Sequence, residues 1–207
     1  MKKIILIVGL LISNSTFASF TKGNGGNALI CEGQASGIIL DYYEATEVLG
    51  FSIDAKLESQ FDRIILDRLI GLGNRFDNLA ARQFAENFKI HLDQFSRQNI
   101  WISGASLGEV NDSYHLAIPS HCTLEQAAVQ STSRYFLQAD IWYNLTEFQK
   151  NTLRLHELIY RTLLSRQVLL DSRPVRALVG LLLSQEFSQM TLVEITQFFK
   201  THQIKLN

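Results

Sequence analysis

The stretch that decides the fold is residues 134–165, RYFLQADIWYNLTEFQKNTLRLHELIYRTLLS. Its first ten residues alternate between two interleaved sets of side chains, and this period of two predicts a strand over residues 134–143. Thr146 followed by Gln149 forms a capping box, which predicts a helix from there to about residue 165. A strand that leads directly into a long helix indicates a protein that contains both strands and helices.

The segments on either side of this stretch favour the α+β class. Periodic apolar residues predict long helices, and short apolar runs with brief connections predict strands that pair antiparallel. The sequence therefore predicts helices packed around a small antiparallel sheet. The predicted helices lie at about residues 54–72, 77–95, 171–184 and 191–200, with a short one opening at Asp41, and strands lie at 28–32 and 100–102.

Two details of the first long helix can be predicted. Gly71 and Gly73 are placed to end it. Arg68 falls within its apolar arc, so it either extends outward to solvent or pairs with a buried carboxylate, for which Asp41 and Glu44 are the candidates.

The N-terminus has the features of a bacterial signal peptide. Lys2 and Lys3 precede an apolar run at residues 4–12, which is too short to span a bilayer, and small residues end at Ala18. We therefore expect cleavage after residue 18 and delivery to the periplasm or the outside of the cell. The predicted organisation is a signal peptide at 1–18, a flexible Gly/Asn-rich lead-in at 19–27 and one globular domain at 28–207.

Composition restricts the class of protein. The chain has 207 residues, of which 46% are hydrophobic, and a formal net charge of −1. This composition excludes a disordered or coiled-coil protein, and the balanced charge implies no nucleic-acid partner. No apolar run after the signal peptide reaches membrane length, so we expect no membrane span in the mature chain.

Cys31 and Cys122 are the only cysteines. Because an exported protein folds in an oxidising compartment, a disulfide between them is the simplest use of both. A metal pair or two free thiols are the alternatives, but neither has a supporting motif such as Cys-x-x-Cys.

The strongest hint of chemistry is His156-Glu157 on the helix of residues 146–165. In zinc-dependent peptidases such a pair supplies a metal ligand, here His156, and a general base, here Glu157. The second histidine of that motif is replaced by Tyr160, so only half of the motif is present. Ion pairing of Glu157 with Arg154 and Arg161, three residues before and four after it, explains the glutamate without catalysis. The sequence predicts no cofactor, and zinc only under the hydrolase alternative.

Residues 104–108, Gly-Ala-Ser-Leu-Gly, have the spacing of the nucleophile elbow of serine hydrolases. That motif requires a strand before it and a helix after it. A strand is predicted before Gly104, but no helical pattern follows Gly108, so a serine hydrolase is not favoured.

Several of these segments together resemble an uncharacterised family of exported bacterial proteins. The resemblance rests on Gly23-Asn24-Gly25-Gly26 with Cys31, residues 40–45, Trp142, His156-Glu157 with Tyr160-Arg161, and residues 171–182. It implies an exported globular protein and no particular activity. The residues that it singles out are Asp41, Glu44, His156, Glu157, Tyr160, Asp171 and Arg173.

The sequence thus predicts an exported bacterial globular protein of unassigned activity, for which association with the cell envelope or binding is the role considered, and it identifies no partner. The alternative is a zinc-dependent hydrolase with His156 as ligand and Glu157 as general base.

Overall fold

The computed structural model describes residues 26–108, 116–165 and 171–206. The predicted signal peptide at 1–18 lies outside the described residues, as does the predicted lead-in up to residue 25. Gly26 and Asn27, at the end of that lead-in, are buried, and Asn27 already begins the first strand.

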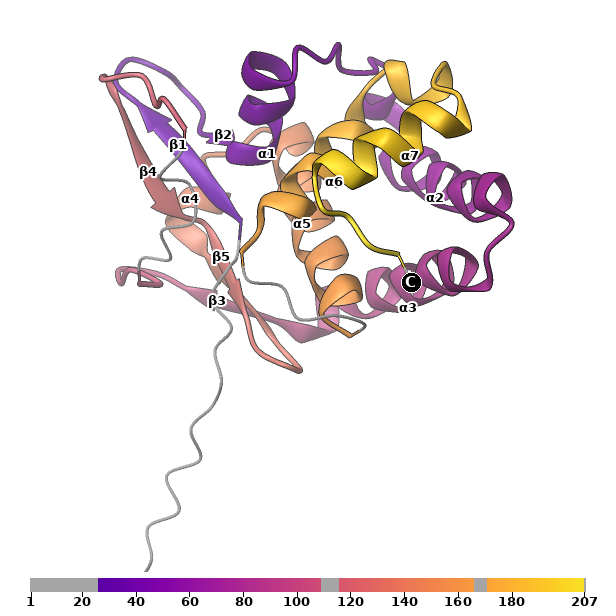
Figure 1. The fold of residues 1–207 in the computed structure, drawn as a ribbon. Coiled ribbons are helices and arrows are strands. Elements are labelled where there is room, and N and C mark those ends of the chain that lie inside the picture. Colours follow the sequence, from indigo (N-terminus) through magenta and orange to yellow (C-terminus); the bar gives the residue numbers. More distant parts are fainter. Residues whose placement is uncertain (1–25, 109–115, 166–170, 207) are drawn as a thin grey trace, which may run out of the picture.

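The described strands form two small sheets on one side of the molecule (Figure 1). One sheet has the order β2-β1-β4 and is antiparallel, and the other has the order β3-β6-β5, in which β3 and β6 are parallel. The strands are β1 (Asn27–Cys31), β2 (Ile38–Ile39), β3 (Asn99–Ile102), β4 (Cys122–Gln126), β5 (Ala128–Gln130) and β6 (Tyr135–Gln138). Only Ala127 separates β4 from β5, so these two strands link the sheets directly.

Helices account for most of the remaining described chain. They are α1 (Leu40–Tyr43), the π-helical turn η1 (Glu44–Val48), α2 (Leu57–Phe76), α3 (Leu79–Gln98), α4 (Ala139–Trp142), α5 (Glu147–Leu164), α6 (Arg173–Leu183), the 3-10 turn η2 (Glu186–Ser188) and α7 (Leu192–Thr201). The α+β class is therefore confirmed. The prediction of a single antiparallel sheet is wrong in detail, because two sheets form and one pairing is parallel.

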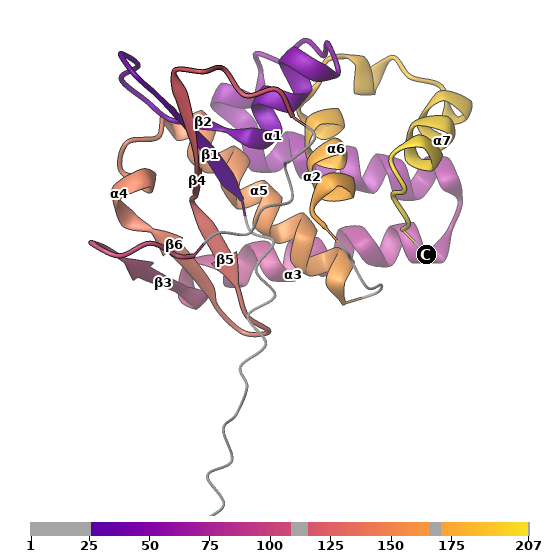
Figure 2. The same ribbon diagram turned by 60° about the vertical axis from the view of Figure 1, so that its left-hand side comes forward.

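Helix α5 is the centre of the fold. It contacts α1, α2, α3 and α6 as well as β2 and β5, and Figure 2 shows it between the sheets and the other helices. The apolar side chains on its inner faces, among them Leu153, Leu158 and Ile159, are at most 1% exposed. Polar side chains that share these inner faces must find their partners inside the protein.

The strand predicted at residues 134–143 is only half correct. Strand β6 ends at Gln138, and the next four residues form α4. The parallel partner β3 ends at Ile102, and beyond it the Asp140 carboxylate accepts hydrogen bonds from Ser103 Oγ and Gly104 N. The backbone therefore turns where its partner strand ends, although the alternation of buried and exposed residues continues.

The predicted end of the first long helix is wrong. Helix α2 runs through Gly71 and Gly73 and ends at Phe76, where Asp77 adopts a left-handed conformation with φ of 44°. Gly73 serves packing instead, because a Cβ there would lie 3.1 Å from Arg82 Cα on α3. The missing side chain allows α2 and α3 to approach closely.

Arg68 does pair with a carboxylate, but neither Asp41 nor Glu44 is that partner. Its guanidinium donates to Asp54 Oδ2 and to the Leu182 carbonyl, so it joins the start of α2 to the end of α6.

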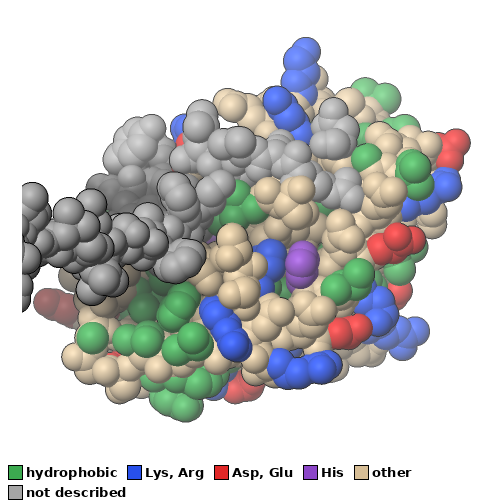
Figure 3. All heavy atoms as spheres, turned by 90° about the horizontal axis from the view of Figure 1, so that it is seen from below, with side chains coloured by type: hydrophobic (Ala, Val, Ile, Leu, Met, Phe, Trp, Pro, Cys, Tyr) green, Lys and Arg blue, Asp and Glu red, His purple; other side chains and the backbone are tan. Residues whose placement is uncertain are grey.

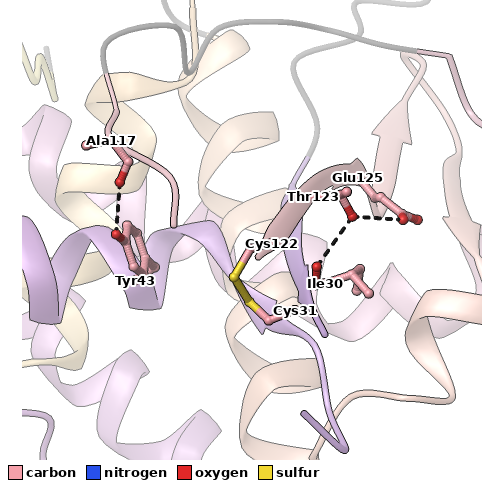
Figure 4. The surroundings of a disulfide bond; sticks show 7 residues. All are labelled: Ile30, Cys31, Tyr43, Ala117, Cys122, Thr123 and Glu125. Atoms are coloured by element: carbon pink, nitrogen blue, oxygen red, sulfur yellow. Dashed lines mark hydrogen bonds between the residues drawn. A yellow bond between two sulfur atoms is a disulfide. The ribbon is translucent and has the colours of Figure 1, made fainter. Parts of the chain in front are cut away.

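The predicted disulfide between Cys31 and Cys122 is present, and its cysteines are 91 positions apart in the sequence. The cysteines are direct cross-strand neighbours of β1 and β4 (Figure 4). Next to them, Thr123 Oγ1 donates to the Ile30 carbonyl across the same two strands. The bond therefore fixes the register of the two strands at the end of the sheet.

No helix among the described residues is both long enough and apolar enough to cross a membrane.

Replacing both cysteines by serine tests the contribution of the disulfide. We expect the free energy of unfolding to fall by about 2–4 kcal/mol, because the bond removes conformational freedom from the unfolded chain. Urea denaturation of the oxidised wild type and the C31S/C122S variant measures the difference, with the reduced wild type as matched control. Identical transitions for all three would contradict this role.

Candidate functional site

The residues that the sequence singled out on α5 face the interior. Thr146 caps the helix by accepting a hydrogen bond from Gln149 N, while the Gln149 side chain accepts from Ile39 N of β2 instead of completing a capping box. Farther along the helix, His156 is 1%, Glu157 0% and Arg161 8% exposed. Each of these side chains therefore depends on hydrogen bonds from other elements.

His156 pairs with Asp41 of α1. The Nδ1–Oδ1 distance is 2.7 Å, and both side chains are almost completely buried. Burial alone would lower the pKa of His156, but the charge and the hydrogen bond of Asp41, helped by Glu157, outweigh it and raise the pKa to about 9. The imidazole is therefore cationic at neutral pH. The Tyr160 ring stacks on it, with ring centres 6.2 Å apart.

Glu157 holds the start of β1 against α5. Its Oε1 accepts from Gly26 N at 2.7 Å, and its Oε2 accepts from Gln130 Nε2 of β5 at 2.9 Å. Burial raises the pKa of Glu157, although His156, the Gly26 hydrogen bond and Arg161 each act to lower it. A Cβ at Gly26 would lie only 2.1 Å from Leu153 Cδ1, so the close approach requires glycine.

Gly26 also connects α5 to the bend between the two sheets. Its carbonyl oxygen accepts from Ala127 N and Ala128 N, both at 3.0 Å, and from Gln126 Nε2 at 3.3 Å. One residue thus ties the buried carboxylate to the point where β4 passes into β5.

Arg161 extends the network to α3 and β6. Its guanidinium lies 3.6 Å from the centre of the Tyr135 ring. Its hydrogen-bond acceptors are Gln98 at the end of α3, Gln130 of β5, and the carbonyls of Ser131 and Arg134. Gln130 therefore bridges Glu157 and Arg161. The predicted pairing of Glu157 with Arg154 is wrong, because Arg154 binds Asp62 and Asn151.

The other candidate residues form separate pairs. Glu44 binds the buried Arg176 of α6, which also donates to Ser172. Asp171 accepts two hydrogen bonds from the exposed Arg173 side chain at the start of α6. The Asp41–His156 pair joins α1 to α5, and the Glu44–Arg176 pair joins η1 to α6.

Most of the side-chain atoms of His156 and Glu157 that would bind zinc or activate a water molecule already bind protein groups. The Nδ1 atom of His156 binds Asp41, and both oxygens of Glu157 accept hydrogen bonds from protein amides. Within the described ranges, the one group of three residues close enough to share a metal ion is Cys31, His121 and Cys122, and its cysteines form the disulfide. His156 has no such ligand set there.

A second candidate site lies on the surface, and residues 104–108 are the part of it that the sequence pattern indicates. A cleft of about 440 Å³ lies between β4, the loop after β3 and the start of α4. Residues that line it include Gly104, Ser106, Glu125, Gln126, Gln138 and Asp140. The hydrogen bonds of Gly104 and Ser103 to Asp140 hold the loop and keep the pKa of this carboxyl below its usual range.

Three aromatic side chains lie on the two elements that lead into this cleft, β3 and the end of α4. Trp101 of β3 lies 5.3 Å from Trp142 and 6.1 Å from Tyr143, measured between ring centres. Trp101 is 44% and Tyr143 72% exposed. We call these three residues the aromatic cluster. Figure 3 shows one face of the molecule, where hydrophobic side chains gather at the end that carries the sheets.

The glycine-serine motif at 104–108 lies in this cleft but lacks the geometry of a nucleophile elbow. Ser106 Oγ accepts from Gly108 N, and the chain forms no helix between β3 and residue 108. No histidine is among the described residues that line the cleft.

Comparison of the chain with protein-family models, curated proteins and solved structures gives no match.

The ionisation of His156 gives a prediction that depends on pH. Its pKa is raised from 6.5 to about 9, so the stability that the pair supplies is complete below about pH 6.5 and is lost as the pH rises through 9. The loss is on the order of 3 kcal/mol, since one pKa unit corresponds to about 1.4 kcal/mol.

NMR titration of ¹³C-labelled imidazoles measures this pKa directly. His202, whose pKa is lowered by burial, serves as the internal control. Substitution D41N is expected to lower the pKa of His156 by more than one unit and to flatten the dependence of stability on pH between 6.5 and 9. An imidazole of His156 that is neutral at pH 7 in the folded wild type would contradict the assignment.

Proposed function

We propose that this chain is an exported bacterial protein that functions by binding a component of the cell envelope at the cleft and the aromatic cluster. The observation that carries the proposal is the exposure of two contacting rings, Trp101 of β3 and Tyr143 directly after α4. The loop that follows β3 and α4 itself both line the polar cleft. Exposed aromatic rings that contact one another are costly in water and are enriched where proteins bind ligands.

Export is supported by two features of the chain. The first 18 residues have the pattern of a cleavable signal peptide. The disulfide between Cys31 and Cys122 suits an oxidising compartment. The periplasm and the outside of the cell both meet this requirement.

The buried network favours a structural role for α5 over a catalytic one. Hydrolysis by zinc requires a ligand set that is open to substrate and to water. Asp41, His156 and Glu157 are instead enclosed, at no more than 1% exposure, and bind one another or the backbone. The contacts of the described residues therefore give the hydrolase alternative no support.

Sedimentation with isolated bacterial envelopes tests the proposal. We expect the purified mature protein, beginning at Ser19 by mass spectrometry, to sediment with envelopes. The W101S/Y143S variant should lose at least 80% of this binding because it lacks the exposed rings. V193S on α7 is the matched control, because Val193 is also exposed, at 77%, and lies outside the cluster.

Two results would contradict the proposal. One is that the wild type and the W101S/Y143S variant sediment with the envelopes to the same extent, which includes the case in which neither protein sediments. The other is stoichiometric zinc in the purified protein that is lost in a folded H156A variant, since this would support the hydrolase.

A further inference from the structure

Cys31, His121 and Cys122 bring together three side chains of the kinds that bind soft metal ions. One imidazole nitrogen and the two sulfurs all lie within 4.8 Å of one another. Zinc, with bonds of about 2.3 Å to sulfur and 2.0–2.1 Å to nitrogen, holds such ligand atoms roughly 3.5–3.8 Å apart. Small rotations of the side chains are therefore enough to bring all three atoms onto one ion once the sulfurs are not bonded to each other.

Backbone contacts also hold these three residues together. Cys31 and Cys122 are opposite residues of the paired strands β1 and β4. His121 directly precedes β4, and its carbonyl accepts a hydrogen bond from Glu32 N, while Cys122 N donates to the Pro119 carbonyl. Because none of these contacts involves a sulfur atom, we expect the group to stay assembled when the S–S bond is broken.

The group is open to solvent on one side. His121 is exposed and Cys122 is half-buried, whereas Cys31 is 7% exposed. On the inner side, the two cysteines belong to a small apolar cluster with Leu29 and Leu40. A metal ion can therefore reach the sulfurs from the solvent side, where water can occupy a further coordination position.

We propose that these three residues form a zinc site that the disulfide keeps closed. In the oxidised protein the two sulfurs are bonded to each other, so neither can act as a thiolate ligand. After reduction, a zinc ion binds the thiolates of Cys31 and Cys122 and the imidazole of His121, and water takes the fourth position. This site goes beyond the proposed function and does not depend on it.

The reductant in this scheme is a dithiol, such as the reduced form of a thiol–disulfide oxidoreductase. One thiolate of the reductant attacks the sulfur of Cys122, the more exposed of the two, and Cys31 leaves as a thiolate. The second thiolate of the reductant then displaces Cys122 from the mixed disulfide. Two electrons pass to the protein, and the reductant leaves as a disulfide. Zinc displaces the two protons of the resulting thiols.

Zinc titration of the mature protein in its two redox states tests the proposal. The reduced sample is prepared with a phosphine, which is removed under nitrogen before zinc chloride is added. We expect the reduced protein to bind zinc with an affinity about a hundredfold or more above that of the oxidised protein, because only free thiolates are ligands. Zinc should also raise the melting temperature of the reduced protein and leave that of the oxidised protein unchanged.

Variants assign the ligands. Because His121 is exposed, H121A should fold with its disulfide intact. Once reduced, H121A should bind zinc about tenfold or more weaker than the wild type, since even a partner that only orients a metal ligand contributes that much. The matched control is H202A, which removes a histidine at the end of α7, outside this group, and should leave zinc binding unchanged. Circular dichroism verifies that each oxidised variant is folded.

Cobalt(II) supplies a spectroscopic readout of the sulfur ligands. A thiolate-to-cobalt charge-transfer band should appear in the reduced wild type and should be absent from C31S/C122S.

Three results would overturn the proposal. The first is equal zinc affinity of the two redox states, which includes the case in which neither binds zinc. The second is equal affinity of reduced H121A and reduced wild type, which covers the case in which reduction unfolds the chain and its thiols bind zinc without His121. The third is a reduced wild type without the charge-transfer band. None of these results bears on the sedimentation experiment, so the proposed function stands or fails separately.

Discussion

The interaction on which the rest of the structure depends is the buried carboxylate of Glu157. A carboxyl group that is 0% exposed must have hydrogen-bond partners, or the helix that carries it cannot occupy the interior. Gly26 and Gln130 supply these donors, one from the start of β1 and the other from β5. The carboxyl group thus fixes β1 and β5, which belong to different sheets, against the same turn of α5.

The contact between Glu157 and Gly26 affects the surface of the protein through further hydrogen bonds of Gly26. The carbonyl of Gly26 accepts from Ala127, Ala128 and the side chain of Gln126, so the residue held by Glu157 also shapes the bend between β4 and β5. That bend places Gln126 at the cleft. Glu157, which suggests catalysis in the sequence, therefore holds the backbone beneath the proposed binding surface.

Local patterns predicted much of this arrangement, and long-range pairing explains the parts they missed. The capping residue Thr146 and the period of α5 are local, and so is the alternation that located β6. The parallel pairing of β3 with β6 joins segments separated by two other strands, and it decides both the end of β6 and the contact of Trp101 with Trp142. No local pattern contains that information, so the cleft and the aromatic cluster were not predicted.

The candidate residues also show that local patterns identify a residue, whereas long-range packing decides its partner. Asp41, Glu44 and His156 were identified as candidates, but the partners of the acids are set by packing: Asp41 meets His156, and Glu44 meets Arg176 of α6. The disulfide was predicted correctly because two cysteines in a chain that is expected to be exported leave few alternatives. Gly26 was assigned to a flexible lead-in, because a glycine-rich segment looks the same whether it is mobile or is pressed against a helix.

Amide hydrogen exchange at Gly26 tests the central claim most directly. If the Glu157 carboxylate holds this N–H, the amide should exchange only on global unfolding, and the conservative variant E157Q should lose at least tenfold of that protection. An amide at Gly26 that exchanges as fast as in an unstructured peptide, or that is equally protected in the wild type and E157Q, would contradict the account.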